Sequence, residues 1–158
     1  MSRVKRIHRS RGGGSSLSEC SSFSCSALID LSVTSRQSVY VVPFGQSRIA
    51  TDETRAIILS VMLRDFSVTP STANLSIGFN EAADNVETDI ALAGTNLFYA
   101  NMCALAIPES QVTANALRAI ANAVLGHMGQ QGQALSVKVT NPEPSPVLCT
   151  IEMSGYLF

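Results

Sequence analysis

Charged side chains are scarce in this sequence. Asp, Glu, Lys and Arg together account for 15% of the 158 residues, whereas about 25% is usual in soluble domains. Because 46% of the residues are hydrophobic, the chain is long and apolar enough for one domain with its own core. With so few charges, much of the surface should be neutral, and neutral, partly apolar surface often becomes buried between subunits.

The sequence also has no apolar run of the roughly 20 residues that a membrane helix requires. Its first residues are basic and lead into Gly and Ser, which is not the pattern of a secretory signal peptide. We therefore expect a protein that is made in the cytosol or its equivalent and has no membrane partner.

Reactive groups are few as well. The two histidines, His8 and His127, have no Cys or Ser beside them in a dyad or elbow pattern. The cysteines show neither a disulfide framework nor metal-ligand spacing, so buried, inert thiols are favoured, while pairing of Cys20 with Cys25 stays open. The four are Cys20, Cys25, Cys103 and Cys149. We therefore expect no enzyme.

What the chain does have is a basic N-terminal arm followed by a flexible Gly/Ser run at 12–16. Five of the eleven Lys and Arg residues fall in the first eleven positions, whereas all twelve acidic residues lie beyond them. No aromatic residue occurs between positions 1 and 22, so contact with nucleic acid would be made to phosphates and would be largely blind to base sequence. The candidate nucleic-acid-binding residues are Arg3, Lys5, Arg6, Arg9 and Arg11.

Period-two alternation of apolar and polar residues is the dominant pattern beyond the arm. One stretch, 110–126, repeats apolar residues at helical spacing and predicts an amphipathic helix. Together these patterns predict an all-β fold, a single jelly-roll β-sandwich with one helix in a connection. We assign 1–26 to a disordered or extended arm and 27–158 to the jelly-roll domain. The predicted strands are 29–34, 39–42, 56–68 with a change of phase at 64–65, 75–79, 97–107, 135–139 and 147–153.

An acidic stretch offers the one candidate metal site. Asp84, Glu87 and Asp89 lie close together in the sequence, and carboxylate oxygens are the ligands that Ca²⁺ prefers. A Ca²⁺ ion at a subunit contact would fit them, but the spacing of an EF-hand is absent, so a solvated loop is the favoured interpretation. No other cofactor is expected.

Local sequence, together with the arm, the hinge and the strand at the C-terminus, resembles the coat proteins of small icosahedral viruses, and is similar to the satellite tobacco mosaic virus type. The resemblance implies a non-enzymatic capsid protein that self-assembles into a closed shell around a single-stranded genome. It further implies that the basic arm faces the genome and that the protein resides in the virion after assembly in the host cytoplasm or nucleus. The matching segments are 29–33, 42–45, 58–64, 69–70 and 106–108.

Many arms on one shell would bind RNA, or with less preference DNA, far more tightly than one arm alone. Two alternatives stay open. The first is a sequence-independent nucleic-acid-binding protein that forms no shell. The second is a non-capsid assembling β-sandwich, such as a tail, fibre or decoration protein, in which the arm binds the acidic surface of a neighbouring subunit.

Overall fold

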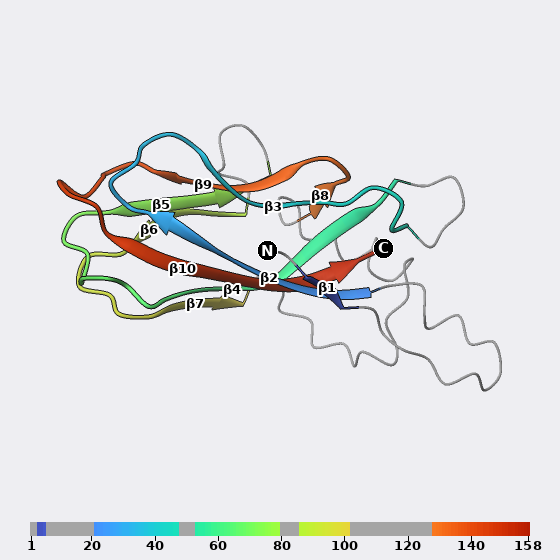
Figure 1. The fold of residues 1–158 in the computed structure, drawn as a ribbon, viewed down its shortest axis with the longest axis horizontal. Coiled ribbons are helices and arrows are strands. Elements are labelled where there is room, and N and C mark those ends of the chain that lie inside the picture. Colours follow the sequence, from blue (N-terminus) through green and yellow to red (C-terminus); the bar gives the residue numbers. More distant parts are fainter. Residues whose placement is uncertain (1–2, 6–20, 48–52, 80–85, 102–127) are drawn as a thin grey trace.

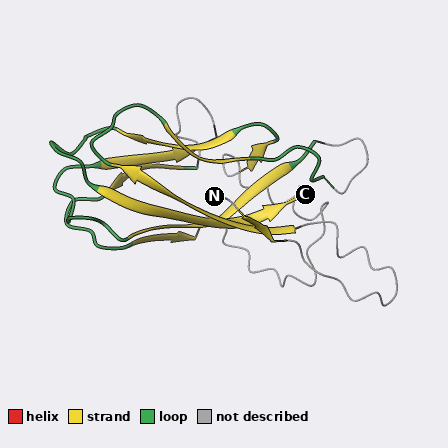
Figure 2. Cartoon of the chain, viewed as in Figure 1, coloured by secondary structure: helices red, strands yellow, loops and turns green. Residues whose placement is uncertain are grey.

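A computed structural model describes residues 3–5, 21–47, 53–79, 86–101 and 128–158. All regular elements in these ranges are β-strands (Figures 1 and 2). The predicted helix at 110–126 lies outside the described residues. In the described ranges no helix long and apolar enough to cross a membrane is found.

The strands form two antiparallel sheets. Sheet A has the order β1-β2-β10-β4-β7, with β8 also paired to β4, and sheet B has the order β3-β9-β5-β6. The strands are β1 Arg3–Lys5, β2 Ser21–Asp30, β3 Gln37–Val41, β4 Arg55–Arg64, β5 Asn74–Gly78, β6 Glu87–Ala91, β7 Phe98–Asn101, β8 Met128–Gln130, β9 Ala134–Val139 and β10 Leu148–Leu157.

The core lies between the two sheets, and the alternating pattern of each strand explains which side chains enter it. On β10, Cys149, Ile151 and Met153 are at most 1% exposed, and the residues between them point away from the core. On sheet B, Leu75 and Leu135 are fully buried. Successive side chains of a strand point to opposite faces, so each sheet needs only one apolar face to form the core between the sheets. The prediction of an all-β sandwich is confirmed for the described residues.

The pairing of the strands follows a nested order. Leaving aside the short β1 and β8, the first strand pairs with the last (β2 with β10) and the second with the second-last (β3 with β9). The next two pairs are β4 with β7 and β5 with β6. The chain is therefore arranged as one long antiparallel hairpin that is rolled up, so that β10 also contacts β4 and β9 also contacts β5.

The first long strand lies earlier in the sequence than predicted. It was expected at 29–34, but β2 spans Ser21–Asp30 and so begins inside the segment assigned to the arm. Phe23 and Cys25 are buried between outward-facing serines, so the Ser-rich stretch has the same period of two. The strand ends because the backbone N–H and hydroxyl of Ser32 both donate to Asp30 Oδ1, at 2.9 and 2.7 Å, which forms a turn.

The change of phase in β4 also occurs at a different place from the predicted 64–65. Ser60 lies opposite Ser154, but Ile58 lies opposite Gly155, so Leu59 is the extra residue of a bulge. The bulge reverses the alternation inside the strand. Asp65 follows the end of β4 with a left-handed φ of 55°, so residues 64–65 mark the end of the strand.

A buried hydroxyl without a partner lies in the core. The Tyr40 ring is 4% exposed and stacks on Phe23 with ring centroids 4.8 Å apart. Among the described residues its hydroxyl group has no hydrogen-bond partner, and burial raises the pKa of this phenol. Burying an unpaired hydroxyl costs about 1–3 kcal/mol.

Replacing this tyrosine should therefore stabilise the fold. Tyr40→Phe keeps the ring and its stacking but removes the unpaired hydroxyl, and we expect the free energy of unfolding to rise by about 1 kcal/mol. Urea unfolding followed by circular dichroism measures the change. A loss of stability in Tyr40→Phe would show that the hydroxyl is satisfied by a group such as a bound water.

Candidate assembly and nucleic-acid surfaces

The start of the predicted arm forms part of sheet A. β1 pairs with β2 so that Arg3 lies opposite Ser24 and Lys5 opposite Ser22. Directly opposed residues share a face of the sheet, and these two serines flank the buried Phe23. Backbone positions 3 and 5 therefore belong to the outer face of sheet A.

The other three predicted nucleic-acid-binding residues, Arg6, Arg9 and Arg11, lie outside the described residues. The binding role of all five basic residues stays a prediction.

The acidic candidates are only partly described. Asp84 lies outside the described residues, and only the backbone of Glu87 is described, in β6. Asp89 is exposed in the same strand, with a left-handed φ of 54°. Among the side chains that the structure describes, no three of His, Cys, Asp or Glu are grouped closely enough to hold a metal ion. The Ca²⁺ site stays a prediction.

The two described cysteines are unreactive. Cys25 and Cys149 are free and buried, and burial is the main cause that raises the pKa of each thiol to about 12. Neither is a thiolate near neutral pH, so neither has the form that acts as a nucleophile or metal ligand. The expectation of buried thiols is confirmed for these two.

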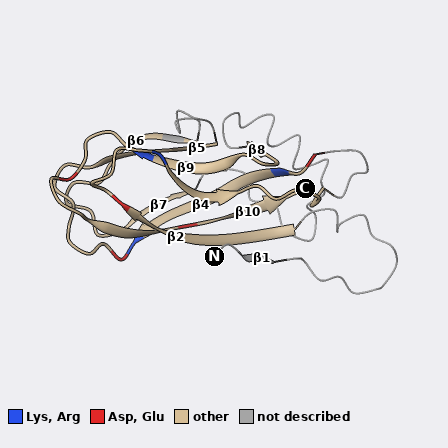
Figure 3. Cartoon of the chain, turned by 45° about the horizontal axis from the view of Figure 1, so that its top comes forward, with Lys and Arg blue, Asp and Glu red and all other residues tan. Residues whose placement is uncertain are grey.

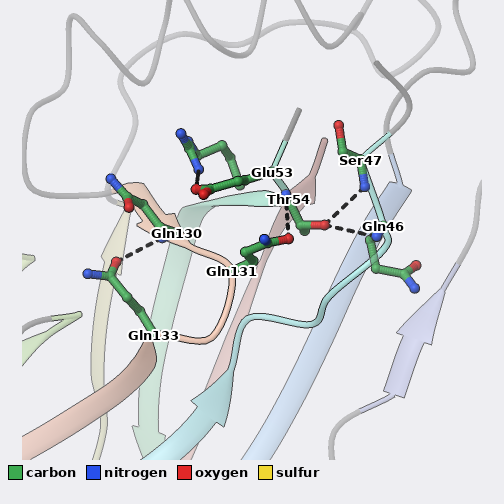
Figure 4. Close-up of polar contacts among 8 residues, drawn as sticks. Gln46, Ser47, Glu53, Thr54, Gln130, Gln131 and Gln133 are labelled. Atoms are coloured by element: carbon green, nitrogen blue, oxygen red, sulfur yellow. Dashed lines mark hydrogen bonds and ion pairs between the residues drawn. The ribbon is translucent and has the colours of Figure 1, made fainter. Parts of the chain in front are cut away.

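A polar network joins β3, β4, β8 and β9 at one end of the sandwich (Figure 4). Thr54 is fully buried, and its Oγ1 accepts hydrogen bonds from the backbone N–H groups of Gln46 and Ser47, at 2.8 and 3.0 Å. The backbone N–H of Thr54 donates to Gln131 Oε1 at 3.2 Å, and the N–H of Gln131 donates to the carbonyl of Thr54 at 2.8 Å. The uncharged side chains of Thr54 and Gln131 form hydrogen bonds with backbone groups. The network therefore holds these loops in place and supplies no reactive group.

A buried carboxylate holds together the loops at the opposite end of the sandwich. Glu143, between β9 and β10, is 6% exposed. Its Oε1 accepts from the backbone N–H groups of Ser71, Thr72 and Ala73 at 2.7–2.9 Å, and its Oε2 accepts from the Ser71 hydroxyl at 2.8 Å. Its N–H donates to the carbonyl of Leu31 at 3.0 Å. Through its side chain and its backbone N–H, this one residue ties together the loops after β2, β4 and β9.

These contacts change the acidity of Glu143. Desolvation is the largest single effect and would raise the pKa, but the hydrogen bonds from Thr72, Ala73 and Ser71 together outweigh it and lower the pKa to about 2. The carboxylate is therefore ionised and held in place at neutral pH. Sequence reasoning did not identify this role of Glu143, because its partners lie about 70 residues away.

Exposed apolar side chains form two groups. Five belong to sheet A and the loops that adjoin it, and the remaining two, Val41 and Phe44, lie on and just after β3 at an edge of sheet B. Monomeric proteins expose apolar residues singly or in small numbers, but a larger group, such as the five at sheet A, marks a contact surface. The five at sheet A are Leu28, Val68, Leu97, Tyr99 and Leu148.

Charges are sparse on the described strands, and Figure 3 shows them isolated among uncharged segments. On sheet A, Arg64 Nε donates to Glu152 Oε2 at 3.0 Å, and a second ion pair joins Arg64 to Asp65. At the Thr54 network, Arg55 pairs with Glu53 at 2.8 Å. The arrangement gives a neutral, partly apolar surface that suits contact with another protein surface.

No family model and no curated protein sequence matches this chain. Among solved structures, the chain is similar to one in the capsid asymmetric unit of cyanophage Pam1, with 16% identity and a TM-score of 0.48, covering 98% of this chain and 91% of that one. It is also similar to one in the acid-stable capsid of Helicobacter pylori bacteriophage KHP30, with 11% identity and a TM-score of 0.41, covering 85% and 86%. The resemblance to coat proteins of the satellite tobacco mosaic virus type stays a prediction.

Proposed function

We propose that this chain is a viral structural protein whose copies self-assemble into a closed icosahedral capsid. The nested strand pairing, β2 with β10 through β5 with β6, carries the proposal. An eight-stranded hairpin rolled into two sheets is the jelly roll, a fold that viral capsid domains use. The low charge and the exposed apolar side chains at sheet A support contacts between many copies.

The basic arm is proposed to hold a single-stranded genome, RNA in preference to DNA. Five cations within eleven residues would bind nucleic acid weakly when alone, because each phosphate contact is weakened by salt. Arms displayed together on one shell would act at a high effective concentration. Packaging would then depend on assembly.

Electron microscopy of the purified protein, with absorbance at 260 and 280 nm recorded on the same fraction, tests the proposal. Uniform closed particles that contain nucleic acid are the expected result, and digestion with RNase or DNase then identifies the cargo. A monomer or small oligomer without nucleic acid, across a range of salt concentrations, would contradict the proposal.

Removing the positive charge of the arm should separate packaging from assembly. With Arg3, Lys5, Arg6, Arg9 and Arg11 all replaced by Gln, we expect particles to form but to contain at least about tenfold less nucleic acid, because the phosphate contacts are lost. The ratio of absorbance at 260 to 280 nm of purified particles measures this.

The matched control is Lys138→Gln, which removes one exposed cation of sheet B and should leave the cargo unchanged. If the neutral arm abolished oligomers instead, the arm would be acting on a neighbouring subunit. That outcome would favour a non-capsid assembling β-sandwich.

A further inference from the structure

The outer face of sheet A carries exposed apolar side chains on its β2 and β10 flank. Leu28 lies opposite Thr150, and Leu148 lies opposite Asp30, so the two leucines are diagonal neighbours on the same face. Leu28 is 65% exposed and Leu148 is 38% exposed. Both leucine side chains are accessible to solvent, although the opposite face of each strand packs in the core.

The β4 and β7 flank of the same face is also apolar. Tyr99 lies opposite Met62 and is 61% exposed, and Leu97, which precedes β7 directly, is 60% exposed. Their neighbour Phe98 packs against the core, so the alternation of the strand leaves positions 97 and 99 on the outer face. We call Leu28, Met62, Leu97, Tyr99 and Leu148 the sheet A patch.

Between the two flanks lies the Arg64–Glu152 ion pair. Thr150 is opposite Arg64, and Glu152 is opposite Met62, so both charges lie on β10 and β4, the two middle strands of this face. Arg64 already bonds Glu152 at 3.0 Å and pairs with Asp65. A nucleic acid requires cations that are free to meet its phosphates, and this arginine is already paired with two carboxylates. Positions 3 and 5 of β1 belong to the same face, but they lie opposite Ser24 and Ser22, toward the other end of β2 from Leu28. The part of the face around the Arg64–Glu152 pair is therefore better matched to a neutral protein surface.

Resting on the proposed function, we propose that the sheet A patch is a contact surface for a second copy of this chain. A contact between two identical patches requires a face that complements itself, and a face that carries charges of both signs, Arg64 beside Glu152 and Asp65, meets that requirement. Three strands of ten residues, β2, β10 and β4, and the four-residue β7 present a face of roughly 500 Å², which is of the same order as the about 800 Å² that each partner buries in a standard interface.

The test compares two pairs of substitutions by analytical ultracentrifugation and electron microscopy. Leu28→Ser with Tyr99→Ser removes one apolar side chain from each flank, and Val41→Ser with Phe44→Ser removes two side chains of similar exposure from the edge of sheet B, at 54% and 69%. We expect the first pair to raise the protein concentration needed for assembly at least about tenfold. The control pair should change it less than about twofold. Urea unfolding confirms that both variants fold.

Failure of the inference is distinguishable from failure of the proposed function. If the unaltered protein assembles and the sheet A variant assembles equally well, or if the control pair is equally damaging, the sheet A patch is not the contact surface. If the unaltered protein does not self-associate at any concentration, the proposed function fails, and this inference fails with it.

Discussion

Replacing Gly155 with Ala is expected to destabilise the fold by about 4–5 kcal/mol or to prevent folding altogether. A Cβ atom at this position would lie 1.9 Å from the backbone oxygen of Ile57 and 3.0 Å from the Phe23 ring. The first clash is with backbone, which cannot rotate away, so β10 and β4 would have to separate at the bulge that sets the phase of sheet A. Total stabilities of about 5–15 kcal/mol leave little reserve for such a loss.

Urea unfolding, or the soluble yield if the variant does not fold, measures the effect. Gly94→Ala is the matched control, because Gly94 has a left-handed φ of 74° but open space around it. It should cost only about 1 kcal/mol of backbone strain. If Gly155→Ala lowered the unfolding free energy no more than this control does, β10 and β4 would not approach each other closely at this position.

Replacing Glu143 with Ala should destabilise the fold by about 3 kcal/mol, because it leaves the three N–H groups of Ser71, Thr72 and Ala73 without their charged acceptor. Glu143→Gln preserves the shape and one acceptor oxygen, so it should cost less. Glu53→Gln removes an exposed carboxylate, 54% accessible and paired with Arg55, and should cost at most about 1 kcal/mol.

The contribution of Glu143 should also depend on pH. Its pKa is lowered from 4.5 to about 2 in the folded protein, so folding favours the ionised form. The stabilisation is fully present above the unfolded pKa and is lost as pH falls from about 4.5 through about 2. The difference in unfolding free energy between the unaltered protein and Glu143→Gln should therefore shrink across this window. A difference that stayed constant down to pH 2 would contradict the hydrogen-bonded carboxylate.

The strands that alternate cleanly could be predicted from the sequence. Cys149, Ile151 and Met153 were expected on one face of the last strand, and all three are buried there. The start of β2 at Ser21 was missed because serine is typical of linkers. Only the burial of Phe23 and Cys25 between the serines shows that the segment belongs to the sheet.

The candidate surfaces were less predictable. Low charge pointed to neutral contact surfaces, but no local pattern shows that Leu28 and Tyr99 lie on the same face of one sheet. They come from strands separated by about 70 residues, and two other strands, β10 and β4, lie between them in the sheet. The partners of Glu143 are similarly distant along the chain.

The sequence by itself determined the strands that alternate cleanly, such as 147–153, and the concentration of positive charge in the arm, because periodicity and composition are local properties. The tertiary structure alone decided the nested strand order, the bulge at Leu59 and the loops that Glu143 joins. Each of these depends on pairing between segments far apart in the chain, where register and backbone contact decide the outcome. Such pairing leaves no local pattern in the sequence.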